Sequence, residues 1–267
     1  MMPELMGVLN VTPDSFSDGG RFVIPRVAVD HGLRMLDEGA TVLDVGGEST
    51  RPGSEAVTEA AEIARVRPVI EGVLKARPNA QVSIDTQKAE VARVAIESGA
   101  CIVNDVSAGR DPHMLSLVAK TGVRYVLMHM RGVPKTMQRD TNYDDLIGDI
   151  AASLGEAADR ARASGIGAER IVVDPGVGFG KAAADNPKII ASVPRFKALG
   201  YPVLIGASRK SFIGRLTEQP NAAARMAGSV GAALAAVDSG ADWLRVHDVR
   251  ETHDALTVYL ACKSPAS

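Results

Sequence analysis

Eight short apolar runs recur along the chain and constrain its fold more than any other feature. Each run is rich in valine, isoleucine and leucine and has the length of a strand that is buried on both faces. The expected strands are Leu5–Asn10, Thr41–Gly46, Gln81–Asp85, Cys101–Asp105, Arg124–Met128, Ile171–Asp174, Pro202–Gly206 and Asp242–His247. Between them, apolar residues have helical spacing, for example in Val27–Leu36, Val91–Ile96, Leu115–Ala119, Leu146–Ala161 and Met226–Val237. Eight strands that alternate with helices predict a parallel (β/α)₈ TIM barrel.

The length of the chain fits one such barrel. A barrel of this type fills about 250 residues as a single domain, and the chain has 267 residues. We therefore expect one α/β domain over residues 1–267. Gly39-Ala40, Gly99-Ala100 and Gly240-Ala241 each precede an apolar run, which is typical of a helix that ends at a left-handed glycine. A doubly wound open sheet is the alternative, although it would usually have fewer strands.

Nearly every expected strand ends at a polar side chain. These residues are Asn10, Asp44, Asp85, Asn104, His129, Asp174, Ser208 and His247. In a parallel barrel all C-terminal strand ends lie on one rim, where active sites are built. Single residues of this kind also cap helices, but the repetition at strand after strand favours a polar site on that rim.

Composition and charge argue against several classes of function. Thirty Lys and Arg residues stand against 32 Asp and Glu residues, for a net charge of -2, so the chain lacks the basic excess of a nucleic-acid-binding protein. Two cysteines cannot form a disulfide framework or a cysteine zinc cluster. No run approaches the roughly 18 apolar residues of a membrane helix, and the N-terminus lacks the features of a secretory signal. We expect a cytoplasmic protein that binds small molecules.

Two long loops follow the first two strands. Residues 11–22 contain hydroxyls, carboxylates and a glycine pair, and a loop of this length suits a flap over an anionic ligand. The alternative is a solvated surface loop, which would leave Phe16 exposed. In the second loop, Gly46–Gly53, the glycines let a ligand approach the backbone, while Thr50 and Arg51 supply donors for an anion. Arg51 could equally be a surface charge.

The glycine-rich segment after the sixth strand is not a nucleotide-binding loop. The phosphate-binding pattern requires glycine and a hydroxyl residue where this chain has Pro175 and Ala182. What remains is a tight turn, from Asp174 to Lys181, that could approach a flat ring closely.

The last two strands are followed by basic residues. Loops after strands seven and eight frequently bind phosphate in these barrels, and Ser208–Ser211 follows the seventh strand. Alternation places Arg245 and His247 on the same side of the eighth strand. If that side is the lumen, they form a cationic corner with Arg51 for a multiply charged anion.

The deep rim residues suggest the shape of a ligand. Asp85 and Asp174 can each accept two parallel hydrogen bonds, which suits a guanidine-like edge. Asn104 and Lys210 can donate to a ring carbonyl oxygen and ring nitrogens. A 2-amino-4-oxo pyrimidine fused to a pyrazine has those edges. The alternative is an internal Asp–Lys ion pair that only stabilises the barrel.

Taken together, the sequence motifs resemble those of the dihydropteroate synthase family. The first two signatures are long, the matches fall in family order, and they cover roughly residues 6–250. The matching segments are Gly7–Gly20, Asp44–Gly53, Ser83–Thr86, Val103–Asp105, Leu127–Met130, Asp174–Gly176, Gly206–Lys210 and Arg245–Asp248.

The resemblance implies a specific transferase activity. The family joins 6-hydroxymethyl-7,8-dihydropterin diphosphate to 4-aminobenzoate, which releases pyrophosphate and forms 7,8-dihydropteroate in folate synthesis. It also implies Mg²⁺ as cofactor, a homodimer and a sulfonamide target. Loop closure would form the second substrate site and exclude water. Because the amine of aminobenzoate attacks in its neutral form, no strong general base is needed.

The resemblance also assigns residues to the substrates. The pterin would be held by Asp85, Asn104, Asp174 and Lys210, with Met128 and Phe179 lining the pocket. The diphosphate would be bound by Asn10, Thr50, Arg51, Arg245 and His247, with Asn10 also touching Mg²⁺. The aminobenzoate site would include Phe16, Asp18, Pro52, Lys210 and Ser211. The residues expected to take part in catalysis are Asn10, Asp18, Arg51, Lys210, Arg245 and His247.

Three other functions fit parts of the pattern. A pterin-binding methyltransferase domain shares the barrel but should lack the first two loops. A non-catalytic paralogue would bind pterin without turnover, and an unrelated barrel isomerase would need a catalytic Glu or Asp–Lys set. Many dihydropteroate synthases carry a strand pair before the first barrel strand, whereas only Met1–Leu5 precede it here, so the closure of the barrel floor is left open.

Overall fold

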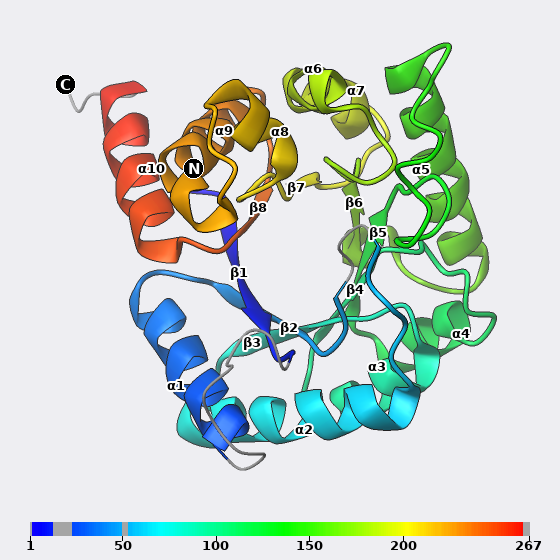
Figure 1. Ribbon diagram of the computed structural model, residues 1–267. Coiled ribbons are helices and arrows are strands. Elements are labelled where there is room, and N and C mark those ends of the chain that lie inside the picture. Colours follow the sequence, from blue (N-terminus) through cyan, green and yellow to red (C-terminus); the bar gives the residue numbers. More distant parts are fainter. Residues whose placement is uncertain (1, 13–22, 50–52, 264–267) are drawn as a thin grey trace.

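Eight parallel strands surround a central axis and helices form a ring outside them (Figure 1). The computed structural model describes residues 2–12, 23–49 and 53–263. The strands are β1 Glu4–Asn10, β2 Val42–Gly46, β3 Gln81–Asp85, β4 Ile102–Asp105, β5 Arg124–Met128, β6 Ile171–Asp174, β7 Leu204–Ile205 and β8 Trp243–Val246. The α-helices are α1 Val23–Asp37, α2 Glu59–Ala76, α3 Ala89–Glu97, α4 Met114–Thr121, α5 Leu146–Ala163, α6 Asn186–Ala191, α7 Val193–Lys197, α8 Ser211–Leu216, α9 Met226–Asp238 and α10 Val249–Lys263.

The strand order closes the sheet into a barrel. Neighbouring strands pair in the order β6-β5-β4-β3-β2-β1-β8-β7. A parallel bridge between Val173 and Val203 then joins the two ends of that order. The predicted (β/α)₈ barrel is therefore confirmed, and the doubly wound open sheet is wrong.

The predicted strands all occur, and β3, β5 and β6 have the predicted bounds. The seventh strand is shorter than expected, since only Leu204 and Ile205 form its ladder with β8. One cause is Pro202, which has no N–H to donate to a neighbouring strand. The three Gly-Ala phrases also behave as predicted: Gly39, Gly99 and Gly240 have φ of 108°, 105° and 96° directly after α1, α3 and α9.

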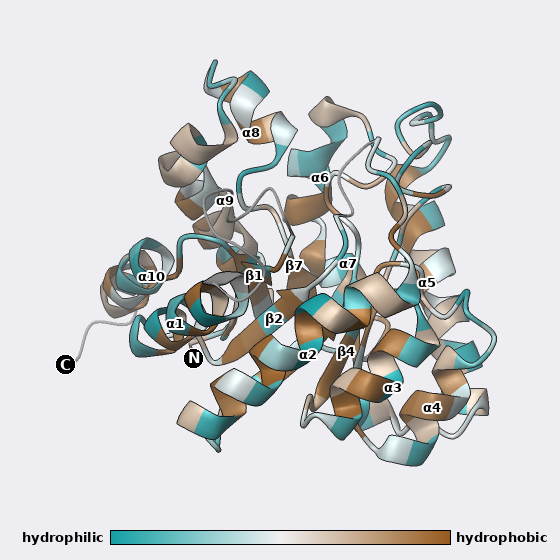
Figure 2. Cartoon of the chain, turned by 60° about the horizontal axis from the view of Figure 1, so that its bottom comes forward, coloured by the Kyte–Doolittle hydropathy of each residue, from teal (hydrophilic) through white to brown (hydrophobic). Residues whose placement is uncertain are grey.

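Apolar side chains fill the lower part of the barrel lumen. One buried cluster is built from strand residues of seven strands, namely Met6, Val42, Ile102, Val126, Val172, Leu204 and Trp243. We refer to this cluster as the apolar floor of the lumen. A second and larger cluster fills the space between the strands and the helices, and Figure 2 shows apolar strands enclosed by helices that carry both hydrophilic and hydrophobic residues. No helix within the described ranges is long and apolar enough to cross a membrane.

Candidate active site

A polar layer lies directly above the apolar floor of the lumen. Successive strand residues point to opposite faces, so a residue two positions after a lumen residue also faces the lumen. Asp44, Asn104, Met128, Asp174 and Arg245 each follow a floor residue by two positions. The strand registers place Asp85 opposite both Gly46 and Asn104. The lumen at the C-terminal ends of the strands therefore holds the predicted deep rim residues, and Arg245 is on the lumen side as predicted.

Four strands contribute to one buried network around Asp44. The Oδ2 atom of Asp44 accepts hydrogen bonds from Asn104 Nδ2 at 2.9 Å and from Arg245 Nε at 2.6 Å. Arg245 Nη2 donates to Asp85 Oδ2 at 2.7 Å. The exposed fractions of Asp44 and Asp85 are 0% and 7%. One guanidinium thus neutralises part of the charge of two buried carboxylates.

Each carboxylate in this network keeps one buried oxygen without a hydrogen bond. Asp44 Oδ1 and Asp85 Oδ1 have no partner among the described residues. Burial raises the pKa of Asp85 to about 7, aided by Asp44, while Arg245 opposes the shift. A buried acceptor without a partner is costly, so Asp85 Oδ1 is suited to bind N–H groups of a ligand.

Asn104 is oriented differently from the expectation that it donates to a ring. A carboxylate can only accept, so the atom that faces Asp44 is the amide nitrogen. The Oδ1 atom of Asn104 receives no hydrogen bond from the described residues. Asn104 therefore offers the ligand its Oδ1 as an acceptor and the second hydrogen of Nδ2 as a donor, and Lys210 adds a further donor.

Asp174 and Lys210 lie on the opposite part of the rim and do not form an ion pair. Lys210 Nζ donates to the carbonyl of Val177 and lies 4.4 Å from the ring centroid of Phe179. Asp174 Oδ1 accepts from Gly176 N at 2.7 Å. Burial lowers the pKa of Lys210 to about 8, with Asp174 opposing the shift. Burial raises the pKa of Asp174, and Lys210 opposes that shift.

An apolar wall adjoins these charged groups. Phe179 packs against a small buried cluster that is separate from the main core and consists of Val106, Met128, Met130 and Met137. Flexible thioethers and an aromatic ring make favourable contacts with a flat heterocycle. Met128 and Phe179 are thus brought together beside Asp174, as a pocket for a flat ring requires.

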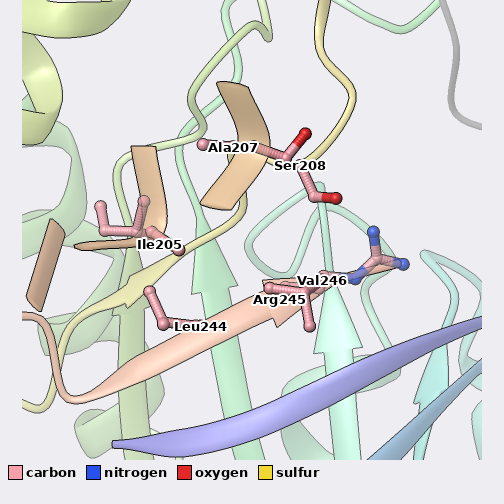
Figure 3. A pocket seen from close by; sticks show the side chains of 8 residues that line it. Ile205, Ala207, Ser208, Leu244, Arg245 and Val246 are labelled. Carbon is pink, nitrogen blue, oxygen red and sulfur yellow. The ribbon is translucent and has the colours of Figure 1, made fainter. Parts of the chain in front are cut away.

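The loops after β7 and β8 are joined to each other by side chains. Ser208 Oγ lies 3.1 Å from His247 Nδ1 and accepts from His247 N at 3.2 Å. Arg209, which has a left-handed φ of 60°, directs its guanidinium to Asp248 Oδ1 at 2.5 Å. Figure 3 shows Ser208 and Arg245 projecting at this end of the barrel. The small cavity beside them has room for about 10 Å³, little more than one water molecule.

Comparison with known proteins identifies the family. The model of the family described as pterin binding enzyme matches residues 6–247. The dihydropteroate synthase of Mycobacterium leprae is 47% identical over 263 residues, which cover 96% of this chain and 92% of that protein. The dihydropteroate synthase of Xanthomonas albilineans with 4-aminobenzoic acid is 48% identical, with a TM-score of 0.93 and coverage of 99% of this chain and 94% of that one.

Two further solved structures carry other ligands. The Xanthomonas albilineans enzyme in complex with 7,8-dihydropteroate has a TM-score of 0.90 at 45% identity, covering 99% of this chain and 95% of that one. The Yersinia pestis dihydropteroate synthase with a sulfonamide drug has a TM-score of 0.92 at 43% identity, covering 98% and 94%. The chain belongs to the dihydropteroate synthase family.

Several residues that the dihydropteroate synthase resemblance assigns lie outside the lumen layer or outside the described residues. Asn10 ends β1, and its Oδ1 would lie 3.7 Å from a Cβ added at Gly46. Ser211 is exposed and begins α8. The residues that fall outside the described ranges are Phe16, Asp18, Thr50, Arg51 and Pro52.

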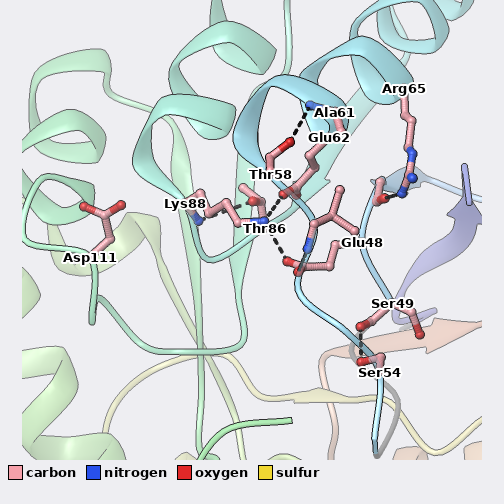
Figure 4. A network of polar contacts seen from close by, with 12 residues as sticks. Glu48, Ser49, Ser54, Thr58, Ala61, Glu62, Arg65, Thr86, Lys88 and Asp111 are labelled. Atoms are coloured by element: carbon pink, nitrogen blue, oxygen red, sulfur yellow. Dashed lines mark hydrogen bonds and ion pairs between the residues drawn. The ribbon is translucent and has the colours of Figure 1, made fainter. Parts of the chain in front are cut away.

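The loop that follows β2 is held at its base by contacts of Glu48 with Val57 and Lys88 (Figure 4). Glu48 Oε1 accepts from Val57 N at 2.8 Å, which joins the two ends of the loop. Lys88 Nζ donates to Glu48 Oε2 at 2.9 Å and to the fully buried Glu62 at 2.6 Å. Burial raises the pKa of Glu62, and Lys88 opposes the shift. The spacing of these residues in the sequence did not indicate this contact.

Sequence reasoning gave no role to Asp44, although it placed Asp44 at a strand end. The residue contacts both Asn104 and Arg245 and is the centre of the lumen network. Its position among the rim residues was the available signal, because an aspartate that faces a closed lumen needs a partner.

Proposed function

We propose that the chain condenses 6-hydroxymethyl-7,8-dihydropterin diphosphate with 4-aminobenzoate to give 7,8-dihydropteroate and pyrophosphate. Membership of the dihydropteroate synthase family supports this activity. The observation in the structure that carries it is the set of buried acceptors in the lumen. Asp85 Oδ1 has no hydrogen bond from the described residues although it is buried beside Arg245.

The lumen complements the polar edges of a pterin. The 2-amino group and the ring N–H groups are donors, and Asp85, Asp174 and Asn104 present acceptors. Lys210 supplies a donor for the ring carbonyl or a ring nitrogen. Phe179 and Met128 cover apolar faces of the ring. This arrangement orients the pterin with its methylene carbon toward the open rim.

The leaving diphosphate would meet cations at that rim. Arg245 uses Nε and Nη2 for Asp44 and Asp85, which leaves Nη1 to donate to a phosphate oxygen. His247, which Ser208 orients, is the second group. Thr50 and Arg51 are assigned to the same anion by the family resemblance. Neutralising the developing charge makes diphosphate a better leaving group.

The attacking amine needs positioning more than deprotonation. As the C–O bond to diphosphate breaks, the electron pair leaves with the diphosphate and positive charge develops on the pterin methylene. The electron-rich ring, with the Asp174 carboxylate nearby, spreads that charge. The neutral amine of 4-aminobenzoate forms the new C–N bond and then loses its proton. The family resemblance assigns Ser211, together with Lys210, to the surroundings of the aminobenzoate carboxylate.

The protein oxygen atoms at the rim fit a Mg²⁺ ion whose ligands come largely from the substrate. Mg²⁺ usually keeps several waters and binds one or two protein oxygens together with substrate phosphates. Within the described residues no three His, Cys, Asp or Glu side chains gather as a metal site, whereas the Asn10 amide lies at the rim beside the lumen. Asn10 would hold the ion, which when bound supplies charge neutralisation for the diphosphate.

A two-substrate product assay tests this function. We expect pyrophosphate and 7,8-dihydropteroate only when pterin diphosphate, 4-aminobenzoate and Mg²⁺ are all present, and chelation by EDTA should stop the reaction until Mg²⁺ is restored. Product-free mixtures in which pterin still binds would instead support the non-catalytic paralogue.

We also propose that the chain acts in the cytoplasm as a homodimer, as the family resemblance implies. The elements α8 and α9 present two exposed apolar side chains, Leu216 and Met226, with exposed fractions of 70% and 38%. Light scattering after gel filtration should give twice the chain mass. Cell fractionation tests the location.

A further inference from the structure

Lys181 is a buried ammonium that the proposed reaction does not use. It ends the glycine-rich segment that fails the nucleotide-binding pattern, and its exposed fraction is 2%. No ion pair joins it to a carboxylate within the described part of the chain. A buried charge of this kind is costly unless its hydrogen bonds are satisfied, so its position calls for an explanation.

Lys181 Nζ makes three polar contacts in this buried position. It lies 2.9 Å from His129 Nδ1 and donates to the His129 carbonyl at 3.1 Å and to the Phe179 carbonyl at 2.8 Å. Burial lowers the pKa of Lys181 to about 7, with Asp174 opposing the shift; in its protonated form the lysine can only donate, and His129 Nδ1 is then the acceptor. Burial lowers the pKa of His129 to about 3, and the charge of Lys181 adds to that shift. The imidazole is therefore a neutral acceptor at physiological pH.

These contacts join two loops behind the apolar wall of the pocket. His129 follows β5 directly, and its N–H donates to the Asp174 carbonyl at 2.9 Å. Phe179 lies in the turn that follows β6. A Cβ at Gly176 would overlap the His129 carbonyl and lie 3.1 Å from Lys181 Nζ. The turn and the lysine therefore pack so closely that the path of residues 176–179 depends on both.

The turn that Lys181 restrains also contacts Lys210. The segment that Lys181 restrains carries the Val177 carbonyl, which accepts from Lys210, and the Phe179 ring, which lies 4.4 Å from Lys210 Nζ. Burial raises the pKa of Asp174, and Lys210, the Gly176 N–H and Lys181 oppose that shift. Lys181 thus acts on both sides of the pocket without reaching the ligand.

We propose that Lys181 is a positioning residue for the pterin pocket, which holds the 176–179 turn so that Phe179 and Lys210 face Asp174. The proposal rests on pterin as the ligand of the lumen. It gives a role to the lysine that ends the glycine-rich segment, for which the sequence indicated only a tight turn.

The test is titration of the full chain with 6-hydroxymethylpterin, together with steady-state kinetics. For Lys181→Met we expect the Kd to rise at least tenfold and the KM for pterin diphosphate to rise with it. We expect kcat to fall less than threefold and the melting temperature to stay within a few degrees. Lys188→Met is the matched control, because the side chain of that lysine is 68% exposed on α6 and pairs with Asp185. It should bind and turn over as the wild type does.

A double-mutant cycle separates positioning from general stabilisation. If Lys181 acts in part through Lys210, the rise in Kd caused by Lys181→Met should be smaller in the Lys210→Met background than in the wild type. Additive losses, or a Lys181→Met variant with wild-type Kd, would overturn the proposal. If Lys181→Met does not fold, Lys181→Gln, which keeps an amide donor, takes its place in the cycle, and failure of both to fold makes the lysine a folding residue only.

The wild-type chain distinguishes this proposal from the proposed function. A wild type that does not bind 6-hydroxymethylpterin refutes both. A wild type that binds it but forms no dihydropteroate refutes the synthase activity and leaves the comparison of Lys181 variants valid.

Discussion

Replacing Asp85 by asparagine should separate binding from stability. The substitution keeps the shape of the side chain but turns one acceptor oxygen into an NH₂ donor that faces donors of the pterin. Two charge-assisted hydrogen bonds, worth about 1.5–3 kcal/mol each, depend on this carboxylate. The smaller value gives a loss of about 3 kcal/mol, which is about a hundredfold in Kd.

The folded chain should tolerate this change. Asp44 retains its hydrogen bonds to Asn104 and Arg245 when Asp85 becomes neutral, so the guanidinium is not left without a carboxylate. The substitution also removes a buried charge next to Asp44. We therefore expect Asp85→Asn to melt at a temperature equal to or above that of the wild type at pH 8.

The pH dependence follows from the pKa of Asp85, which burial raises from 3.8 to about 7. Between those values the folded chain holds a proton that the unfolded chain has lost, so this group makes the wild type less stable as pH rises from 4 to 7. The melting temperature of the wild type relative to Asp85→Asn should therefore fall from pH 5 to pH 8. Pterin affinity of the wild type should rise over the same range, because the carboxylate is the binding form.

Calorimetric titration with 6-hydroxymethylpterin and thermal unfolding at pH 5, 6, 7 and 8 measure both quantities. A Kd within threefold of the wild type would show that Asp85 does not bind the pterin. A large loss of melting temperature at pH 8 would show that its pairing with Arg245 is mainly structural.

Three other substitutions probe separate parts of the site. Gly176→Ala should lower the free energy of unfolding by more than about 2 kcal/mol, since φ there is 69° and the new Cβ would overlap the His129 carbonyl; urea unfolding measures this, and Gly231→Ala, in open space on α9, should not destabilise. Ser208→Ala should raise the KM for pterin diphosphate about threefold or more and leave the Kd for 6-hydroxymethylpterin unchanged, because both contacts of Ser208 Oγ with His247 are lost; an equal rise in both constants would contradict this. Phe16→Ala should raise the KM for 4-aminobenzoate without changing pterin affinity, and an unchanged KM would remove Phe16 from that site.

The barrel could be predicted because its signals are local. Each strand is an apolar run of fixed length, each helix has its own periodicity, and three turns contain a glycine that adopts a left-handed conformation. The shortened β7 was not predicted. Whether Pro202 and Val203 join a ladder depends on how β7 meets β6 where the barrel closes, and the sequence of β7 alone does not reveal this.

The sequence predicted which polar residues lie in the lumen, but not which of them contact one another. Strand-end polarity found Asp85, Asn104 and Asp174 because parallel strands bring their ends to one rim. The contact of Arg245 with Asp44 joins residues 201 positions apart and depends on the stagger of the barrel strands, which no single strand reveals. The same stagger places Asn104 so that its amide nitrogen donates to Asp44 and its Oδ1 is available to a ligand.

The balance of charge in the lumen argues for a ligand rich in donors. Among the described residues, Asp44, Asp85 and Asp174 are buried there with Arg245 and Lys210 as the cations, so acceptors outnumber the donors that this part of the chain supplies. Hydrogen bonds to a neutral guanidine-like edge would satisfy the remaining oxygens without adding a charge to be desolvated. A chain selected for stability alone would fill these positions with apolar residues, as it does one layer below. We therefore infer that the polar layer directly above the apolar floor is a binding site whose acceptors complement the donors of a pterin.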